Sequence, residues 1–134
     1  MNVVLDTNVF VSGIFWTDNA PAKIIDLWME KKFSLVSSLD MVKELVETLQ
    51  EFKIKLDDQL IQSWATTVIE NAVMVQPTIK IDLVKEDLDD NKFFEAAVAG
   101  GAEFIVSYDR HLLSIGKYQN TRVILPSEFL KFIN

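Results

Sequence analysis

Residues 89–109 read DDNKFFEAAVAGGAEFIVSYD, and this stretch decides the fold. A helical pattern runs to the glycine pair at 100–101, which is a stop signal for a helix. The run at 103–107 is nearly all apolar, as strands buried on both faces of a parallel sheet are. Asp109 lies just beyond this predicted strand. A helix that leads into a buried strand indicates a parallel α/β sheet.

The same alternation of apolar runs and helical patterns extends over the rest of the chain. Further strands are predicted at 2–5, 33–37, 71–75 and 122–125. Further helices are predicted at 19–32, 37–52, 57–71 and 126–133. The segment 76–87 fits neither pattern and is expected to be an irregular connection. We predict a three-layer α/β/α sandwich with a central parallel five-stranded sheet and right-handed crossovers, as a single domain over residues 1–134.

Composition excludes several classes of protein. The 134 residues are 49% hydrophobic, which suits one domain with a substantial core. Because there is no cysteine, disulfides, thiolate zinc sites and cysteine nucleophiles are excluded. The formal net charge of −7 argues against a broad basic surface for nucleic acid, but allows a small acidic site that binds cations.

Two further observations concern location. No apolar run approaches the roughly 18 residues that a membrane-spanning helix needs. The N-terminus starts directly with a strand-like segment and has no basic-then-apolar signal pattern. We therefore expect a soluble, cytoplasmic protein that does not associate with a membrane.

Acidic residues collect where a ligand would bind. Ligands of open parallel sheets bind beyond the carboxyl ends of the strands. Asp6 and Asp109 follow predicted strands, and Asp87, Asp89 and Asp90 precede the helix before the fourth strand. Clustered carboxylates repel one another unless a cation neutralises them, and oxygen ligands favour Mg²⁺ or Mn²⁺. Such ions can activate water to hydrolyse a phosphodiester.

Each acid taken alone also has a structural interpretation. Asp6, Asp89, Asp90 and Asp109 all stand where a helix cap or first-turn acid is common. Glu44 lies inside a predicted helix and away from the centre of its apolar stripe, so periodicity places it on a solvated face.

Four segments resemble the PIN-domain family, the metal-dependent ribonuclease fold of VapC-type toxins in bacterial and archaeal toxin–antitoxin systems. They are VVLDTNVFVSGIF (3–15), SSLDMVKELVETL (37–49), DLDDNKFFEAAVAGGAEFIVSYDRHLL (87–113) and VILPSEFL (123–130). The third is specific, whereas the others are weak alone. Together they cover nearly the whole chain in order, and the resemblance implies the strand order 3-2-1-4-5.

The resemblance also implies the site. The positions that match the family's catalytic and metal-binding acids are Asp6, Glu44, Asp90 and Asp109. It implies that they bind one or two Mg²⁺ or Mn²⁺ ions, directly or through water. Asn8 and Ser107 match positions that support the site by hydrogen bonding. We assign Asp90 rather than Asp89 because Asp90 lies seven residues before Ala97, as the family's acid does before its small helix residue.

The implied activity is hydrolysis of RNA by a toxin that pairs with an antitoxin protein and forms a homodimer. Lys43, Lys92 and Arg110 adjoin the acids in sequence, so we predict that they contact RNA phosphates. The chain departs from the family pattern at Tyr108, where glycine is usual, and at His111, where many members have another acid. The tyrosine could crowd the site or stack on a base.

The residues at the end of the first predicted strand also bear on other functions. A haloacid-dehalogenase-like phosphotransferase needs an Asp-x-Asp pair, but the chain has Asp6-Thr7-Asn8. A receiver-type signalling domain needs adjacent acids at the end of the first strand, but the chain has Leu5-Asp6-Thr7. A catalytically degenerate binding or regulatory module remains the alternative, with the acids acting as helix caps.

Overall fold

The computed structural model describes residues 1–133, which form a six-stranded sheet with helices on both sides. The strands are β1 (Asn2–Leu5), β2 (Ser34–Ser37), β3 (Val73–Met74), β4 (Phe104–Val106), β5 (Lys117–Tyr118) and β6 (Thr121–Ile124). The helices are α1 (Thr7–Phe15), α2 (Ala20–Met29), α3 (Leu39–Glu51), α4 (Asp58–Asn71), the 3₁₀ turn η1 (Leu88–Asp90), α5 (Asn91–Gly100), α6 (Arg110–Ile115) and α7 (Pro126–Phe132).

The order of the strands is β3-β2-β1-β4-β6-β5. The first five of these positions are parallel and follow the predicted order 3-2-1-4-5, because β6 is the predicted strand at 122–125. The prediction missed β5, which pairs antiparallel with β6 at the edge of the sheet. β5 lies in the mostly polar stretch GKYQN (116–120), whereas β3, which is equally short, lies in the apolar run at 71–75, so only β3 has a signal in the sequence pattern.

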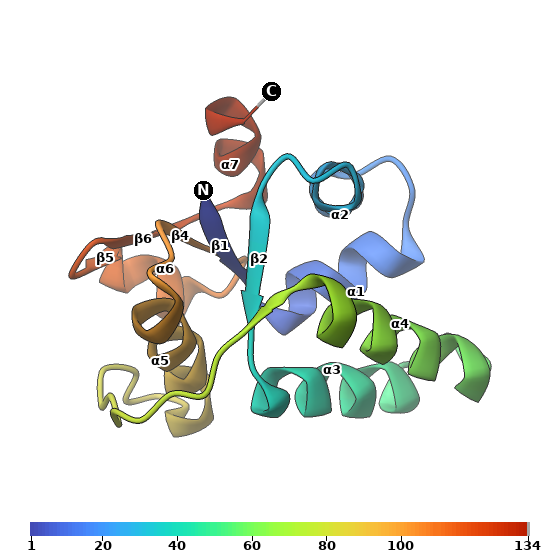
Figure 1. Cartoon of the computed structure of the whole chain (residues 1–134), viewed down its shortest axis with the longest axis horizontal. Helices are drawn as coiled ribbons and strands as arrows, with labels where there is room; N and C mark the ends of the chain where they lie inside the picture. Colours follow the sequence, from blue (N-terminus) through green and yellow to red (C-terminus); the bar gives the residue numbers. More distant parts are fainter. Residues whose placement is uncertain (134) are drawn as a thin grey trace.

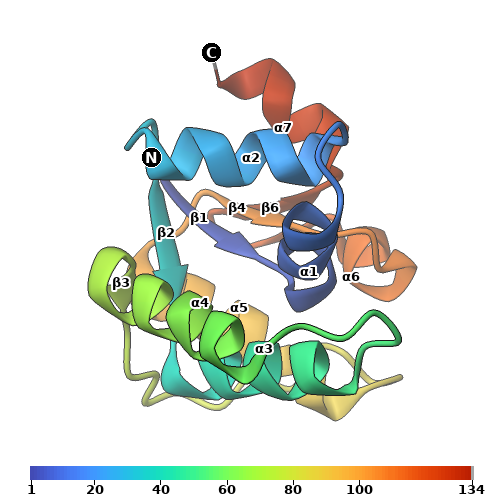
Figure 2. The same cartoon turned by 90° about the vertical axis from the view of Figure 1, so that its right-hand side faces the viewer.

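The strands are buried on both faces, as their nearly continuous apolar sequences predict. Val3 and Leu5 of β1 pack into the core beneath α1–α4 and α7, whereas Val4 packs into the core beneath α5 and α6. Figure 1 shows α5 and α6 on one side of the sheet and α1, α2 and α4 on the other. Figure 2, turned by 90°, shows α2 and α7 lying at one end of the molecule and α3 at the opposite end. The three-layer α/β/α prediction is confirmed.

The helix caps explain where two predicted helices begin. The side chain of Asn19 accepts a 2.9 Å hydrogen bond from the Ala22 N–H at the start of α2. Ser38 likewise accepts a 3.3 Å bond from the Met41 N–H at the start of α3. Each side chain satisfies a backbone donor that has no partner inside the helix.

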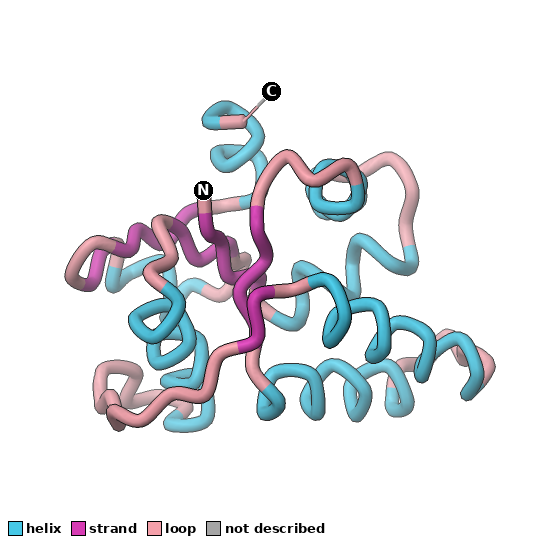
Figure 3. Tube along the Cα trace, viewed as in Figure 1, coloured by secondary structure: helices cyan, strands magenta, loops and turns pink. Residues whose placement is uncertain are grey.

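The predicted irregular segment is confirmed, and α5 holds it in place. Figure 3 shows residues 75–87 as an unbroken loop. The buried Asn91 side chain accepts hydrogen bonds from the N–H groups of Leu83 (2.9 Å) and Val84 (2.7 Å). Its amide donates to the carbonyls of Val84 (3.1 Å) and Leu88 (3.0 Å). One asparagine therefore satisfies four backbone groups of the connector.

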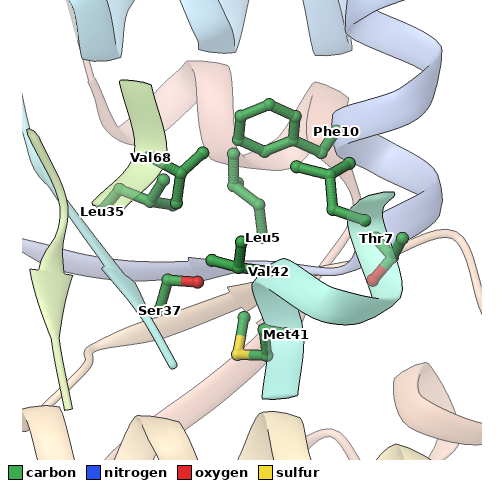
Figure 4. A pocket seen from close by; sticks show the side chains of 9 residues that line it. Leu5, Thr7, Phe10, Leu35, Ser37, Met41, Val42 and Val68 are labelled. Atoms are coloured by element: carbon green, nitrogen blue, oxygen red, sulfur yellow. The ribbon is translucent and has the colours of Figure 1, made fainter. Parts of the chain in front are cut away.

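A small cavity of about 20 Å³ lies between the sheet and α3. Figure 4 shows the mainly apolar side chains around it, including Leu5, Phe10, Val42 and Val68. Its volume holds about one water molecule, so it is a packing feature and not a substrate pocket. Within residues 1–133 no helix combines the length and apolar character needed to cross a membrane.

Candidate functional site

The sheet itself sets the position of two site residues. Asp6 and Ser107 each lie one residue beyond a strand, β1 and β4 respectively. The Asp6 N–H donates a 3.0 Å hydrogen bond to the Val106 carbonyl, and the Ser107 N–H donates a 3.0 Å bond to Ile124. The backbone ladder therefore continues to both residues and brings them together at the carboxyl edge of the sheet.

Asp6 is buried, with only 6% of its surface exposed. It occupies the N-cap position of α1, but its side chain makes no capping hydrogen bond. Its carboxylate instead accepts a 2.6 Å hydrogen bond from the Ser107 hydroxyl. Burial raises the pKa of Asp6, and the charges of Glu44 and Asp109 raise it further, while Ser107 and the Asn8 backbone lower it. The simple cap interpretation therefore does not explain this buried acid.

Ser107 also ties Asp109 to the same place. The Asp109 N–H donates a 2.9 Å hydrogen bond to the Ser107 hydroxyl oxygen. The Asp109 carboxylate caps α6, where its Oδ1 accepts a 2.7 Å bond from the His111 N–H. For Asp109 the cap interpretation is thus correct, but a cap occupies only part of the capacity of a carboxylate, because each oxygen has two lone pairs.

Asp90 lies at the N-cap position of α5 without a side-chain capping bond. Its pKa is raised to about 7, first by burial and then by the charges of Asp87, Asp6, Asp109 and Glu44. A carboxylate shifts this way when it is partly buried and like charges lie around it. The neighbouring Asp89 behaves oppositely, because a hydrogen bond from Lys92 lowers its pKa.

Glu44 is half-buried, and both of its oxygens have partners. Its Oε1 contacts the Lys92 ammonium at 2.5 Å, and its Oε2 accepts a hydrogen bond from the Thr7 hydroxyl. Lys92 also contacts Asp89 Oδ2 at 2.7 Å. Burial lowers the pKa of Lys92, but its bonds to Asp89 and Glu44 outweigh this and raise it. Glu44 therefore faces the site rather than the solvent that its helical periodicity indicated.

The other predicted residues surround this cluster. Lys43, Arg110 and Asn8 are exposed, and Tyr108 has 51% of its surface exposed. Lys92, predicted to contact RNA, has a side chain only 11% exposed and held by two carboxylates. His111 is half-buried, and its Nδ1 lies 3.6 Å from Glu86.

The carboxylates fit a divalent cation that keeps much of its water shell. Among residues 1–133, no lysine, arginine or histidine forms an ion pair with Asp6, Asp90 or Asp109. In the same described part of the chain, no three acidic or histidine side chains are arranged to hold one ion directly. Mg²⁺ is usually bound by one or two carboxylates and several waters, so this donor set suits it.

Two residues that position the site were not predicted. Thr7 holds Glu44, and Asn91 fixes the connector that precedes Asp90. Thr7 follows Asp6 and Asn91 follows Asp90, so both stand next to a predicted acid. A polar residue that is buried beside an acid is a signal for such a role, but burial of single polar residues is not visible in the sequence pattern.

Comparisons with known proteins concern the family and the fold of the chain. A family model described as "PIN domain" matches residues 2–111. An uncharacterized protein of Methanocaldococcus jannaschii is 28% identical over 149 residues, covering 100% of this chain and 95% of that protein. The crystal structure of VapBC2 from Rickettsia felis, bound to a DNA fragment from their promoter, matches with a TM-score of 0.63 and 18% identity. This match covers 92% of this chain and 97% of that one.

Proposed function

Because this chain belongs to the PIN domain family, we propose that it is a metal-dependent endoribonuclease that hydrolyses RNA phosphodiester bonds. The observation that carries the proposal is the convergence of Asp6, Glu44, Asp90 and Asp109, which come from separate parts of the chain, at one place near the carboxyl edge of the sheet. Burial and the charges of its neighbours, among them Asp6, Asp109 and Glu44, raise the pKa of Asp90 to about 7. An acidic cluster of this kind, at the carboxyl edge of a parallel sheet, is a suitable place for a divalent cation.

In this proposal Asp6, Asp90 and Asp109 hold one or two Mg²⁺ or Mn²⁺ ions, directly or through water, and Glu44 completes the shell or orients a water. When bound, such an ion lowers the pKa of water and neutralises charge on a phosphate. Ser107 keeps the Asp6 carboxylate oriented through its 2.6 Å hydrogen bond. Because Asp90 has a pKa of about 7, cation binding competes with a proton there.

The exposed side chains around the acids supply the proposed RNA contacts. Lys43 and Arg110 are exposed and adjoin Glu44 and Asp109 in sequence, so we assign phosphate contacts to them. Tyr108, half of whose surface is exposed, provides an aromatic face on which a base can stack. Since the chain is acidic as a whole, we expect a narrow RNA target rather than general binding of nucleic acid.

We also propose that the chain is the toxin of a toxin–antitoxin pair in the cytoplasm, with an antitoxin protein and a second copy of itself as partners. This rests on the resemblance to VapC-type toxins and on the fold shared with the VapBC2 structure. Purification of the chain from its native host, followed by sizing and identification of bound proteins, tests both partners.

The test of the activity is cleavage of a diverse single-stranded RNA pool by the purified chain. Cleavage is expected with Mn²⁺ and is expected to be lost with EDTA and in Asp6→Asn and Asp90→Asn. Asp58→Asn, at an exposed position in the first turn of α4, is the matched control and should cleave normally. Cleavage at the wild-type rate in Asp6→Asn would overturn the assignment of this site. Absence of both cleavage and Mn²⁺ binding would support the non-catalytic binding module.

A further inference from the structure

Lys92, whose side chain is nearly buried, forms an ionic cluster with the half-buried Glu44 and the exposed Asp89 beside the candidate site. Its ammonium lies 2.5 Å from Glu44 Oε1 and 2.7 Å from Asp89 Oδ2, and its side chain is 11% exposed. A buried ammonium is costly unless it is paired. Glu44 comes from α3 and Lys92 from the first turn of α5, so the pair joins two helices that flank the site.

In this cluster each oxygen of Glu44 already has a partner. One oxygen contacts Lys92, and the other accepts a hydrogen bond from Thr7. A divalent ion that bound Glu44 Oε1 would lie next to an ammonium already 2.5 Å from that oxygen. Two positive charges at such a separation repel strongly where little water reaches them.

The remaining acids have the opposite situation. Asp6, Asp90 and Asp109 carry three formal negative charges, and within residues 1–133 none of them is ion-paired with a basic side chain. The site therefore has two unequal halves, one in which a lysine pairs with two acids and one in which three acids have no basic partner.

We propose that the Lys92 ammonium takes the place of a second divalent ion between Glu44 and Asp89, so that the site binds a single ion among Asp6, Asp90 and Asp109. The inference rests on the proposed function and deepens it. Lys92 and Glu44 are then positioning residues: they fix α5 against α3 and set the place of Asp90, two residues before Lys92. Glu44 Oε1 and Asp89 Oδ2 both contact the Lys92 ammonium nitrogen, so an ion that replaced the ammonium would lie between two carboxylate ligands that are already in place.

The experiment is calorimetric titration of the metal-free full chain with Mn²⁺. Wild type is expected to bind one ion. Lys92→Met removes the charge but keeps most of the side-chain length, and is expected to bind two ions. The double variant Lys92→Met/Glu44→Gln should return to one ion. Lys85→Met is the matched control, because Lys85 also pairs with an aspartate three positions away, Asp82 at 2.8 Å, but is exposed; it should bind one ion.

Glu44→Gln alone provides a second test that does not depend on the lysine variants folding. It is expected to keep the single ion, whereas Asp90→Asn should lose affinity by more than about 100-fold. Two ions in wild type, one ion in a folded Lys92→Met, or loss of the ion in Glu44→Gln would overturn the role of Lys92 and leave the metal-dependent site standing. No Mn²⁺ bound by wild type would overturn the proposed function itself.

Discussion

The Ser107 hydroxyl donates a 2.6 Å hydrogen bond to the Asp6 carboxylate across 101 positions of sequence. Its oxygen also accepts a bond from the Asp109 N–H at 2.9 Å. Ser107 is fully buried, Asp6 is buried and Asp109 is half-buried. Ser107 thus connects Asp6 and Asp109 of the candidate site through hydrogen bonds.

Ser107→Ala should weaken Mn²⁺ binding by about 10–100-fold, because residues that orient metal ligands contribute this much. It should also lower the free energy of unfolding by about 1–3 kcal/mol, since two buried polar groups lose a partner. Calorimetry and thermal unfolding measure the two effects. Ser114→Ala is the control, because that exposed hydroxyl donates only to the His111 carbonyl; equal Mn²⁺ affinity in the two variants would contradict the assigned role.

Asp90→Asn should stabilise the metal-free protein at pH 8, and should stabilise it less at pH 5. The folded pKa of about 7 lies above the ordinary value of 3.8, so the folded state binds the proton more tightly. The stability that the tighter proton binding by Asp90 contributes is therefore fully present below pH 3.8, and it is lost progressively as the pH rises through 7. The gain at pH 8 is on the order of 1–2 kcal/mol after discounting for solvent around this half-buried group.

Asp89→Asn is the control for that experiment and should have the opposite sign. A hydrogen bond from Lys92 lowers the pKa of Asp89, so this group stabilises the fold above its ordinary pKa and loses that effect in acid. Its replacement should therefore destabilise at pH 8. Thermal unfolding in EDTA at both pH values measures the pair, and a common sign at pH 8 would contradict the electrostatic description of the site.

Asn91→Ala should release the connector at residues 81–88. The asparagine makes four hydrogen bonds to the connector backbone, so its loss should cost about 3 kcal/mol and raise amide hydrogen exchange there. Asn71→Ala, at the exposed end of α4, loses one bond to the Thr67 carbonyl and should change stability by less than about 1 kcal/mol. Unchanged exchange in the connector would disprove the tether.

Gly100→Ala should destabilise the fold by about 1–3 kcal/mol through overpacking. A Cβ at this position would lie 2.6 Å from Val36 Cγ1 and 3.0 Å from Val36 Cγ2, where α5 passes over β2. Val36→Ala makes room, so the double variant should lose less stability than the two single losses added. Chemical denaturation of the four proteins measures this coupling, and strict additivity would show that α5 and β2 are not in tight contact.

The fold was predictable because its signals are local. Val3, Val4 and Leu5 of β1 are all apolar because both faces of the strand are covered. A strand of this kind is visible in the sequence as a continuous apolar run. The positions of Asp6 and Asp109 beyond their strands followed from the same pattern. The edge strand β5 was missed because Lys117 and Tyr118 are not part of an apolar run.

The role of Glu44 was not predictable from its own helix. Periodicity in α3 reports which side of that helix faces the apolar core, and it carries no information about α5. The partner that turns Glu44 into an interior group, Lys92, lies 48 positions away. The prediction that Lys92 contacts RNA was based on its closeness to Asp90 along the chain. That closeness does not determine where the ammonium points, and in the structure it lies between Glu44 and Asp89.

The order of the strands has a consequence for protein synthesis. β1 is synthesised before the other strands, but its neighbour β4 begins only at Phe104. Asp90, which precedes α5, and Asp109, which follows β4, are also synthesised late. A nascent chain of a hundred residues carries Asp6 but neither Ser107 nor Asp109. Because domains fold as units, the acidic cluster cannot assemble until the chain has been synthesised beyond Asp109.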